Sequence, residues 1–593
     1  MDNLKQKTMN KLFLFLSFFF FIGSINAQTA PIKKKAYVDE QKILNVEAAT
    51  PRAGYISAPY RKADGNWYEK TDAGVEQLII DTVAMLATKY DLSNVTGEEK
   101  YFENIAAIPT TLELGERIKI EDTGAEYFVQ NTTVAGFNGG LADGVAVIDL
   151  TGGKYAVVQE INNYFNVKHI GAIGDGVTDD TDAILKALEL YNSIFIPKGT
   201  YIVQEIEILT NNKTITGEGI ESILKLKVGQ NDSNKSVIRI QGSGIAGEYI
   251  ENITLRNFAV NGSASDDAFI TSERQTEGVN TKLNTKNLTI DNLTIYNVGP
   301  DGIDMDDDNL NTTITNNYIY DCGKSGMHLY GMKNSIVNNN KIERCFDVGV
   351  DFTGGATFEN ENTIFSQNNI DSCGTGVRVT SANGLKIENN TIKRITGTTV
   401  SGYLGWGIFV AELNIDYIEI NNNVLDSIFY DGISGKIDKV SGNTINVCDE
   451  GILISNTSGI PLKALIDGNK VSNVSAVNAL VTGTNVVSII RGNIINGRPI
   501  STVGDSVLIV DNIVRNSTTT GITIGGDASQ VSNNKIINSG TDGIKESSGA
   551  INSLISNNHI SDVGNNAIIL SGQGSTATGN YITGTVGASR AAI

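Results

Sequence analysis

Short stretches of alternating apolar and polar residues recur along the chain, each directly after a glycine. In "GIDM", "GMHL", "GVDF" and "GVRV" an apolar residue follows the glycine, then a polar one, then a second apolar one. Side chains of a β-strand alternate between its faces, so the apolar pair should point inward and the polar residue outward. Most adjacent repeats lie 19 to 27 residues apart, which predicts one such strand per repeat. The marker glycines are Gly302, Gly326, Gly349, Gly376, Gly432, Gly451, Gly521 and Gly543.

A second marker, an asparagine, recurs once per repeat ahead of another short strand. Asparagine side chains at one position of successive coils can stack as a ladder, and each coil of a solenoid buries its inward face only against its neighbours. The pattern predicts a parallel β-helix, because the chain lacks the leucine scaffold of leucine-rich repeats and the helix-length apolar patterns of ankyrin repeats. The predicted ladder residues are Asn292, Asn317, Asn340, Asn369, Asn390, Asn423, Asn443, Asn469, Asn493, Asn512, Asn534, Asn558 and Asn580.

The N-terminus has the features of an export signal. Residues 1–27 join an n-region containing lysine to an apolar run at residues 12–22, which is shorter than the ~20 residues that a membrane-spanning helix needs. We expect cleavage after Ala27, and Gln28 at the new N-terminus, in place of cysteine, argues against a lipoprotein. The mature protein is therefore expected to be secreted or periplasmic, without a membrane span.

Composition and charge narrow the fold and the partners. The chain has 62 glycines but only 8 prolines, which favours one long β architecture with tight turns. Residues 28–160 lack the ladder and are expected to form a small N-terminal domain, with the β-helix over residues 161–593. The formal charge of -20 argues against nucleic acid as a partner, whereas a local cluster of Lys and Arg still permits an anionic polysaccharide or oligosaccharide. The sequence does not indicate an oligomeric state.

Residues 166–203 carry a motif with a structural meaning of its own. "GDGVTDDT" places aspartates where a helix begins, and an apolar stripe follows at Ala183, Ile184, Ala187 and Leu188. The segment resembles the opening of the pectate-lyase superfamily of exported, carbohydrate-active β-helices. This resemblance implies an all-β, right-handed parallel β-helix with an N-terminal capping helix. The superfamily includes lyases, hydrolases, epimerases and phage tailspikes, so function has to be inferred from the site.

One column of outward positions holds an unusual set of side chains. The residue two positions after the marker glycine is Asp304, His328, Asp351 and Arg378 in four consecutive coils. Coils lie ~4.8 Å apart, so these groups should form one stack. Further polar residues are expected beside the stack, namely Asp301, Asp306, Lys324, Ser325, Tyr330 and Asp347. A mixture of histidine, lysine, arginine and aspartate is typical of a site that binds and converts a charged ligand.

This set of residues suits β-elimination from a uronic acid, in an algal polymer such as ulvan or in a plant uronan. Elimination needs neutralisation of the uronate carboxylate, a base for the C5 proton and an acid for the oxygen that leaves C4. Arg378 or Lys324 can neutralise the carboxylate, and His328 and Tyr330 can divide the acid and base roles in either order. Asp301, Asp304 and Asp351 are expected to bind substrate. The enzyme is then a polysaccharide lyase, or a dehydratase if the leaving group is the free 4-hydroxyl of a terminal uronate.

A longer repeat after Gly376 carries Tyr403 and Trp406 next to the column. A loop bearing aromatic side chains is expected to stack on a sugar ring or to close the groove into a pocket, which would favour terminal attack. Two other classes remain open. A glycoside hydrolase would use two carboxylates such as Asp304 and Asp351, and a non-catalytic polysaccharide-binding protein or adhesin would need no reactive group.

No cofactor or metal is expected. The run Asp306, Asp307 and Asp308 offers oxygen ligands for Ca²⁺ but lacks the spacing of a dedicated calcium loop. The four cysteines, Cys322, Cys345, Cys373 and Cys448, precede marker glycines and are expected to fill the core as free thiols, although disulfides between neighbouring coils remain an alternative in an exported protein.

Overall fold

The computed structural model describes residues 99–131, 143–159 and 164–584, with gaps at 230–234, 244, 246, 265–275, 356–357, 399–403, 412–413 and 458–459. It also gives the backbone of three short strands, β1 (Tyr60–Arg61), β2 (Trp67–Lys70) and β3 (Glu76–Leu78). The expected signal peptide at residues 1–27 and Tyr403 lie outside the described residues. In the described part, no helix is long and apolar enough to cross a membrane. The chain divides into two compact units, Met1–Ile170 and Gly171–Ile593.

The first unit contains a five-stranded sheet in the order β4-β5-β6-β8-β7. Only β4 and β5 run parallel, and the other pairs are antiparallel. Burial alternates along the inner strands, and Ile118, Ile120, Tyr127 and Val129 fill the core. The strand bounds are β4 (Glu99–Phe102), β5 (Arg117–Ile120), β6 (Glu126–Gln130), β7 (Val147–Leu150) and β8 (Lys154–Val158).

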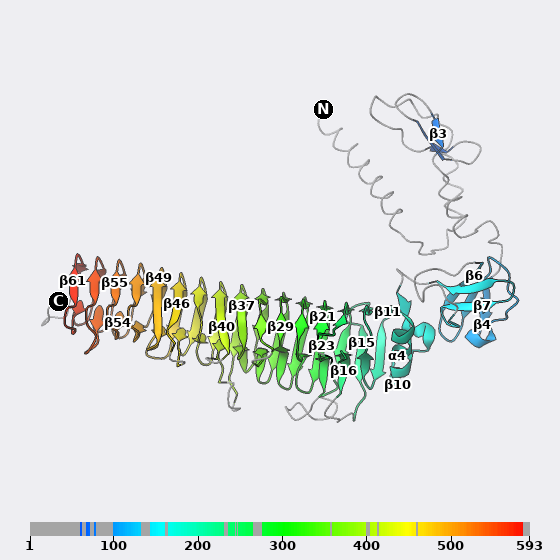
Figure 1. Cartoon of the computed structure of the whole chain (residues 1–593), viewed down its shortest axis with the longest axis horizontal. Coiled ribbons are helices and arrows are strands. Elements are labelled where there is room, and N and C mark those ends of the chain that lie inside the picture. Colours follow the sequence, from blue (N-terminus) through cyan, green and yellow to red (C-terminus); the bar gives the residue numbers. More distant parts are fainter. Residues whose placement is uncertain are drawn as a thin grey trace. The chain divides into compact units, whose positions relative to one another are not determined.

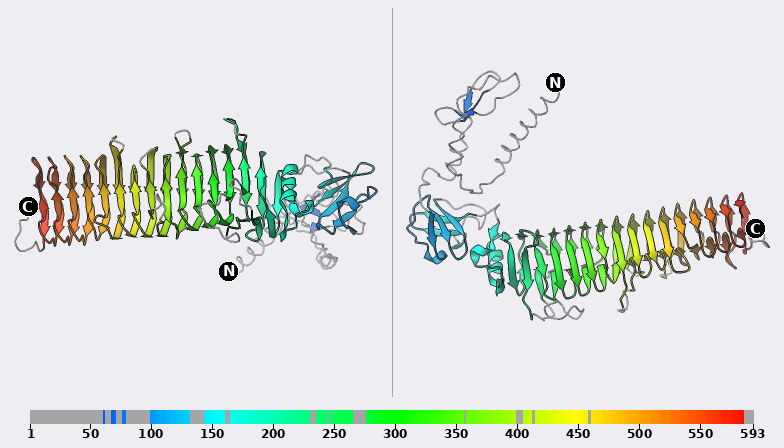
Figure 2. Two further views of the ribbon diagram at one scale, coloured as in Figure 1. Left: turned by 90° about the horizontal axis from the view of Figure 1, so that it is seen from below. Right: turned by 180° about the vertical axis from the view of Figure 1, so that it is seen from behind.

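The second unit is a parallel β-helix, as the repeats predict (Figures 1 and 2). Each coil adds a strand to each of three long parallel sheets, and a fifteen-stranded sheet carries the marker glycines. Its strands are β13 (Ile206–Ile208), β16 (Ser236–Gln241), β20 (Glu277–Lys282), β24 (Ile303–Met305), β28 (Ser325–Tyr330), β32 (Val348–Thr353), β36 (Thr375–Val379), β39 (Ile408–Val410), β42 (Ile433–Gly435), β45 (Ile452–Ile454), β48 (Leu480–Thr482), β51 (Ile500–Thr502), β54 (Ile522–Ile524), β57 (Ile544–Glu546) and β60 (Ile568–Ile569).

A helix begins the solenoid, where the "GDGVTDDT" motif predicts one (Figure 1). Helix α4 (Thr181–Leu190) buries Ile184, Ala187 and Leu188. Asp180 lies just before it and accepts hydrogen bonds from the backbone N–H groups of Ile173 and Gly174, which fixes the preceding turn. The motif therefore shapes both the turn and the start of the helix.

The marker glycines are needed because there is no space for a side chain. A Cβ atom added to Gly302 or Gly326 would lie only 2.5 or 2.4 Å from Cγ2 of Ile319 or Ile342. The same conflict recurs at Gly349 and in later coils. The glycine column is thus a packing requirement that holds the outward residue two positions later in constant register.

The asparagine ladder is present in the core of one turn. Each member donates from Nδ2 to Oδ1 of the asparagine in the next coil, as Asn423 does to Asn443 at 3.0 Å. Two of the predicted members are wrong. Asn368 occupies the ladder in place of Asn369, and Leu293 occupies the position assigned to Asn292. Runs of adjacent polar residues leave the register uncertain by one position.

We expect Asn423→Ala to destabilise the β-helix without changing its surface chemistry. Asn423 is fully buried, and its loss leaves the Asn390 amide and the Ile387 carbonyl without their partners. An unsatisfied buried polar group costs about 1–3 kcal/mol, which denaturant unfolding should detect. The neighbouring exposed Thr444→Ala serves as the control and should change the free energy of unfolding by less than about 0.5 kcal/mol. Equal effects of the two substitutions would contradict the structural role of the ladder.

The four cysteines are buried and free, as expected for core thiols. Cys322 and Cys345 are Cα partners on neighbouring coils.

Candidate functional site

The structure brings the predicted column together on the outer face of the fifteen-stranded sheet. Asp304, His328, Asp351 and Arg378 are successive Cα partners on β24, β28, β32 and β36. The residues before and after each of them are fully buried in the core, so the sheet supplies a rigid base.

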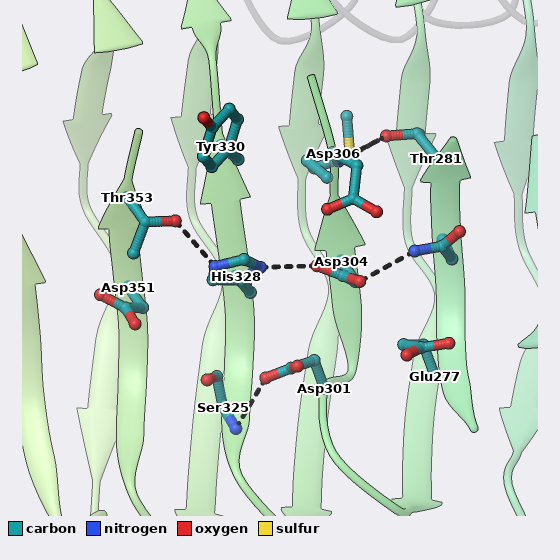
Figure 3. A network of polar contacts seen from close by, with 12 residues as sticks. Glu277, Thr281, Asp301, Asp304, Asp306, Ser325, His328, Tyr330, Asp351 and Thr353 are labelled. Atoms are coloured by element: carbon teal, nitrogen blue, oxygen red, sulfur yellow. Dashed lines mark hydrogen bonds and ion pairs between the residues drawn. The ribbon is translucent and has the colours of Figure 1, made fainter. Parts of the chain in front are cut away.

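His328 is held from both sides. Its Nδ1 lies 2.6 Å from Oδ1 of Asp304, and its Nε2 lies 2.7 Å from the hydroxyl of Thr353. Asn280, one coil earlier, donates to the other oxygen of Asp304 at 2.8 Å. This chain of hydrogen bonds crosses four coils and fixes the ring orientation of His328 (Figure 3).

The surrounding charges favour the imidazolium form of His328. Burial of the ring lowers its pKa, but the hydrogen bond and charge of Asp304, with further carboxylates at Asp301 and Asp351, outweigh burial. The pKa of His328 is therefore raised above its ordinary value. A charged imidazolium can donate a proton from Nε2, which lies against the Thr353 hydroxyl on the next coil.

Two carboxyls with raised pKa values lie beside this chain of hydrogen bonds, the buried Asp301 and the half-buried Glu277. Burial, opposed by the charge of Lys324, raises the pKa of Asp301 to about 6, and burial together with Asp304 raises the pKa of Glu277 to about 7. Glu277 is a member that sequence reasoning missed. It stands directly before Gly278, just as Asp301 stands before Gly302, so the glycine register would have found it.

Lys324 lies at the rim of the site. Its ammonium is 3.7 Å from a carboxylate oxygen of Asp301. Burial raises the pKa of Asp347, and the charge of Lys324 opposes this increase. The Ser325 backbone donates to the same Asp301 carboxylate at 3.0 Å. Lys324 and Asp301 thus face one another one coil apart.

Arg378 is engaged by a carboxylate within the protein. Its Nε and Nη2 donate to the two oxygens of Asp351 at 2.9 and 2.5 Å. Asp351 is only 1% exposed, so this two-pronged pair neutralises a charge that would otherwise be buried beside His328. Asp351 and Arg378 therefore contact each other, and their expected substrate contacts stay predictions.

Tyr330 lies two residues after His328 on β28 and points to the same face (Figure 3). Its ring packs at an angle against Phe358, with centroids 6.3 Å apart. A Cβ atom added at Gly355 would lie 3.2 Å from the Tyr330 hydroxyl, so Gly355 leaves room for that group. His328 and Tyr330, the two residues expected to divide the acid and base roles, thus lie on one strand.

The remaining predicted residues take separate positions. Trp406 is 9% exposed and lies beside the column, stacked on Phe409. Asp306 lies near Lys282, and Asp308 binds Tyr249 and Lys333, so both have protein partners. Among the described residues, the group whose atoms could converge on a metal ion is Asp301, Asp304 and His328, within 4.8 Å of one another.

Comparison with known proteins finds a family match in the first part of the β-helix. Residues 164–378 match the family of rhamnogalacturonase A/epimerase, pectate lyase-like proteins. Alginate lyase 7 of Azotobacter vinelandii is 30% identical over 176 residues, which cover 27% of this chain and 20% of that protein. Mannuronan C5-epimerase AlgE5 of the same organism is 25% identical over 248 residues, covering 38% of this chain and 21% of that protein. The chain therefore spans about a fifth of the length of these relatives.

Solved structures with a similar β-helix include carbohydrate enzymes and phage proteins. The A-module of mannuronan C-5 epimerase AlgE6 from A. vinelandii has a TM-score of 0.32 and 17% identity, covering 71% of this chain and 99% of that module. Tailspike protein 2 of the Escherichia coli O157:H7 bacteriophage CAB120 has a TM-score of 0.45 and 14% identity, covering 75% of this chain and 59% of that protein.

Proposed function

We propose that this chain catalyses β-elimination from a uronic-acid-containing polysaccharide or oligosaccharide, which the match of residues 164–378 to a pectate lyase-like family and the similarity to an alginate lyase and a mannuronan epimerase support. The observation that carries the proposal is His328, fixed between Asp304 and Thr353 with Tyr330 two residues further along the same strand face. A leaving sugar makes the enzyme a polysaccharide lyase, and a leaving hydroxyl makes it an oligosaccharide dehydratase.

The roles of the residues follow from their protonation and position. The phenolic oxygen of Tyr330, as the base, takes the C5 proton, and the electrons of the C5–H bond form the C4–C5 double bond as the C4–O bond breaks. His328 gives its Nε2 proton to the departing oxygen, which takes the place of the Thr353 hydroxyl. The raised pKa of His328 favours this acid role over the reverse assignment.

The substrate carboxylate is neutralised by Lys324, which supplies positive charge at the rim. Asp301, whose pKa is raised to about 6, orients the Lys324 ammonium and donates a hydrogen bond to the substrate only when it is protonated, below about pH 6. Arg378 supports the site indirectly by neutralising Asp351. Both an epimerase at C5 and a lyase break the C5–H bond, so the names of the relatives agree with this chemistry.

A glycoside hydrolase is the second candidate, favoured by the carboxyls rather than by His328. Oxygens of Asp301 and Asp304 lie within 4.8 Å of each other, and the environment raises the pKa of Asp301 to about 6. A neutral acid beside an ionised carboxylate is the arrangement of glycosidases. Asp301 replaces Asp351 in the pair expected from sequence, because Asp351 is bound by Arg378.

The two candidates give different products. The purified protein would be incubated with algal and plant uronans and their oligosaccharides. Three quantities would be measured: the ultraviolet absorbance of the new double bond, the number of new reducing ends and the mass of the products. Absorbing products support elimination, and loss of one water without chain cleavage identifies a dehydratase. New reducing ends without absorbance support hydrolysis, and binding without any product would leave a carbohydrate-binding protein.

We expect the pH dependence of turnover to report on His328. The acid must be protonated, so kcat/KM should fall as pH rises through the raised pKa of His328, above its ordinary value of about 6.5. Asp304→Asn removes the charge that raises this pKa and should move the falling limb to lower pH. Rates would be measured for both proteins across the same pH range. An unchanged limb in Asp304→Asn would contradict the acid role of His328.

A further inference from the structure

One coil after Arg378, the outward column holds an aromatic residue in place of a charged one. Phe409 is the Cα partner of Arg378, and its ring stacks on Trp406 with centroids 4.3 Å apart and planes inclined by 22°. Tyr430 meets Trp406 edge-on, with centroids 5.7 Å apart. We call Trp406, Phe409 and Tyr430 the aromatic rung.

The aromatic rung is well fixed and still accessible. The Trp406 side chain hydrogen-bonds to the buried carboxyl of Asp431, Phe409 is half-buried, and Tyr430 is 37% exposed. Rings that are already ordered bind an apolar surface, such as the face of a sugar, at low entropic cost. Phe409 lies three coils from His328 on the same sheet face, ~14 Å at the usual strand spacing. One carbohydrate chain lying along the column reaches both.

The charges beside the aromatic rung are negative. The pKa of Glu450 is raised to about 7, first by burial and then by the charges of the Asp431 and Asp449 carboxylates. Asp431 also provides the largest contribution to the raised pKa of Tyr430, so the negative potential reaches the rung itself. At Asp301, by contrast, Lys324 and His328 oppose the neighbouring carboxylates. A second uronate is therefore repelled at the rung but tolerated near His328.

We propose that the aromatic rung binds an uncharged sugar of the substrate, so that the preferred substrates are mixed chains of uronates and neutral sugars rather than chains of uronates alone. This inference rests on the proposed function for the identity of the substrate, and on Phe409, Tyr430 and their acidic neighbours for the discrimination.

Equilibrium binding tests the proposal separately from catalysis. The full chain bearing His328→Ala would be titrated with hexasaccharides that alternate uronate and neutral sugar, and with uronate-only hexasaccharides, following tryptophan fluorescence. Trp67 is the only other tryptophan and would be replaced by phenylalanine, which leaves Trp406 as the reporter. We expect the mixed chain to bind more tightly, and Phe409→Ala to weaken its binding about tenfold through loss of stacking. The control is Leu453→Ala, two coils further along the same column, which should leave binding unchanged.

The acidic neighbours provide a second arm. Asp431→Asn with Glu450→Gln should strengthen binding of the uronate-only chain towards that of the mixed chain, because the repulsion is removed. Equal binding of the two chains by the parent protein, no binding of either, or no effect of Phe409→Ala would overturn the proposal. Selective binding that depends on Phe409, in a protein whose wild type eliminates nothing, would refute the proposed function and leave this inference standing.

Discussion

His328→Ala is expected to reduce turnover by about 10²- to 10⁴-fold, the usual cost of losing a proton-transfer group. In the proposed mechanism the imidazole donates to the leaving oxygen from Nε2, while Asp304 holds the ring at Nδ1. The ring is partly exposed on the outer face of β28, so its removal should leave the core packing intact. Rates with the best uronate substrate would be measured together with the denaturant midpoint.

Two further variants decide what the result means. Thr523→Ala, in the same column on β54, controls for the loss of an outward side chain and should keep full activity. Tyr330→Phe should lower kcat in the same range as His328→Ala, because only the hydroxyl is lost. If His328→Ala retains near-normal turnover, the column is a solvated face and the site assignment is wrong. A folded but inactive protein supports it, and product mass then separates a lyase from a dehydratase.

The β-helix was predictable because its packing and hydrogen-bond requirements each fall on a single residue position of the repeat. A Cβ atom added at Gly326 would lie only 2.4 Å from Ile342, so that position accepts only glycine. The glycine therefore recurs in successive coils and reveals the length of the repeat. The ladder asparagines recur for an equivalent reason, since each satisfies its neighbour in a buried turn. The slip from Asn368 to Asn369 arose where two asparagines adjoin and composition alone cannot choose between inward and outward.

The site was only partly predictable. Strand alternation placed Asp304, His328 and Arg378 in one column, since that depends on backbone register alone. The hydrogen-bond partner of each side chain depends on its rotamer and its burial, and neither can be derived from the sequence pattern. The pairing of Arg378 with Asp351, and the burial that raises the Glu277 pKa to about 7, therefore emerged only in three dimensions.

Arg378→Ala is expected to destabilise the β-helix by about 3–5 kcal/mol, the usual cost of removing one partner of a buried ion pair. Asp351 is 1% exposed and would keep its charge without the two hydrogen bonds that Arg378 provides. The measurement is the free energy of unfolding at neutral pH.

The double variant Asp351→Asn with Arg378→Met distinguishes a structural role of Arg378 from a substrate contact. Replacing both members of a buried pair by neutral groups is often nearly neutral in stability, so most of the loss in Arg378→Ala should be restored. If Arg378 acts only by neutralising Asp351, turnover should be restored as well, because His328, Tyr330 and Lys324 are unchanged. A stable double variant with a strongly raised KM would instead show that Arg378 binds the substrate carboxylate directly. Removal of the Asp351 charge should also lower the pKa of His328, so the falling limb of the pH profile should move to lower pH even when stability is regained.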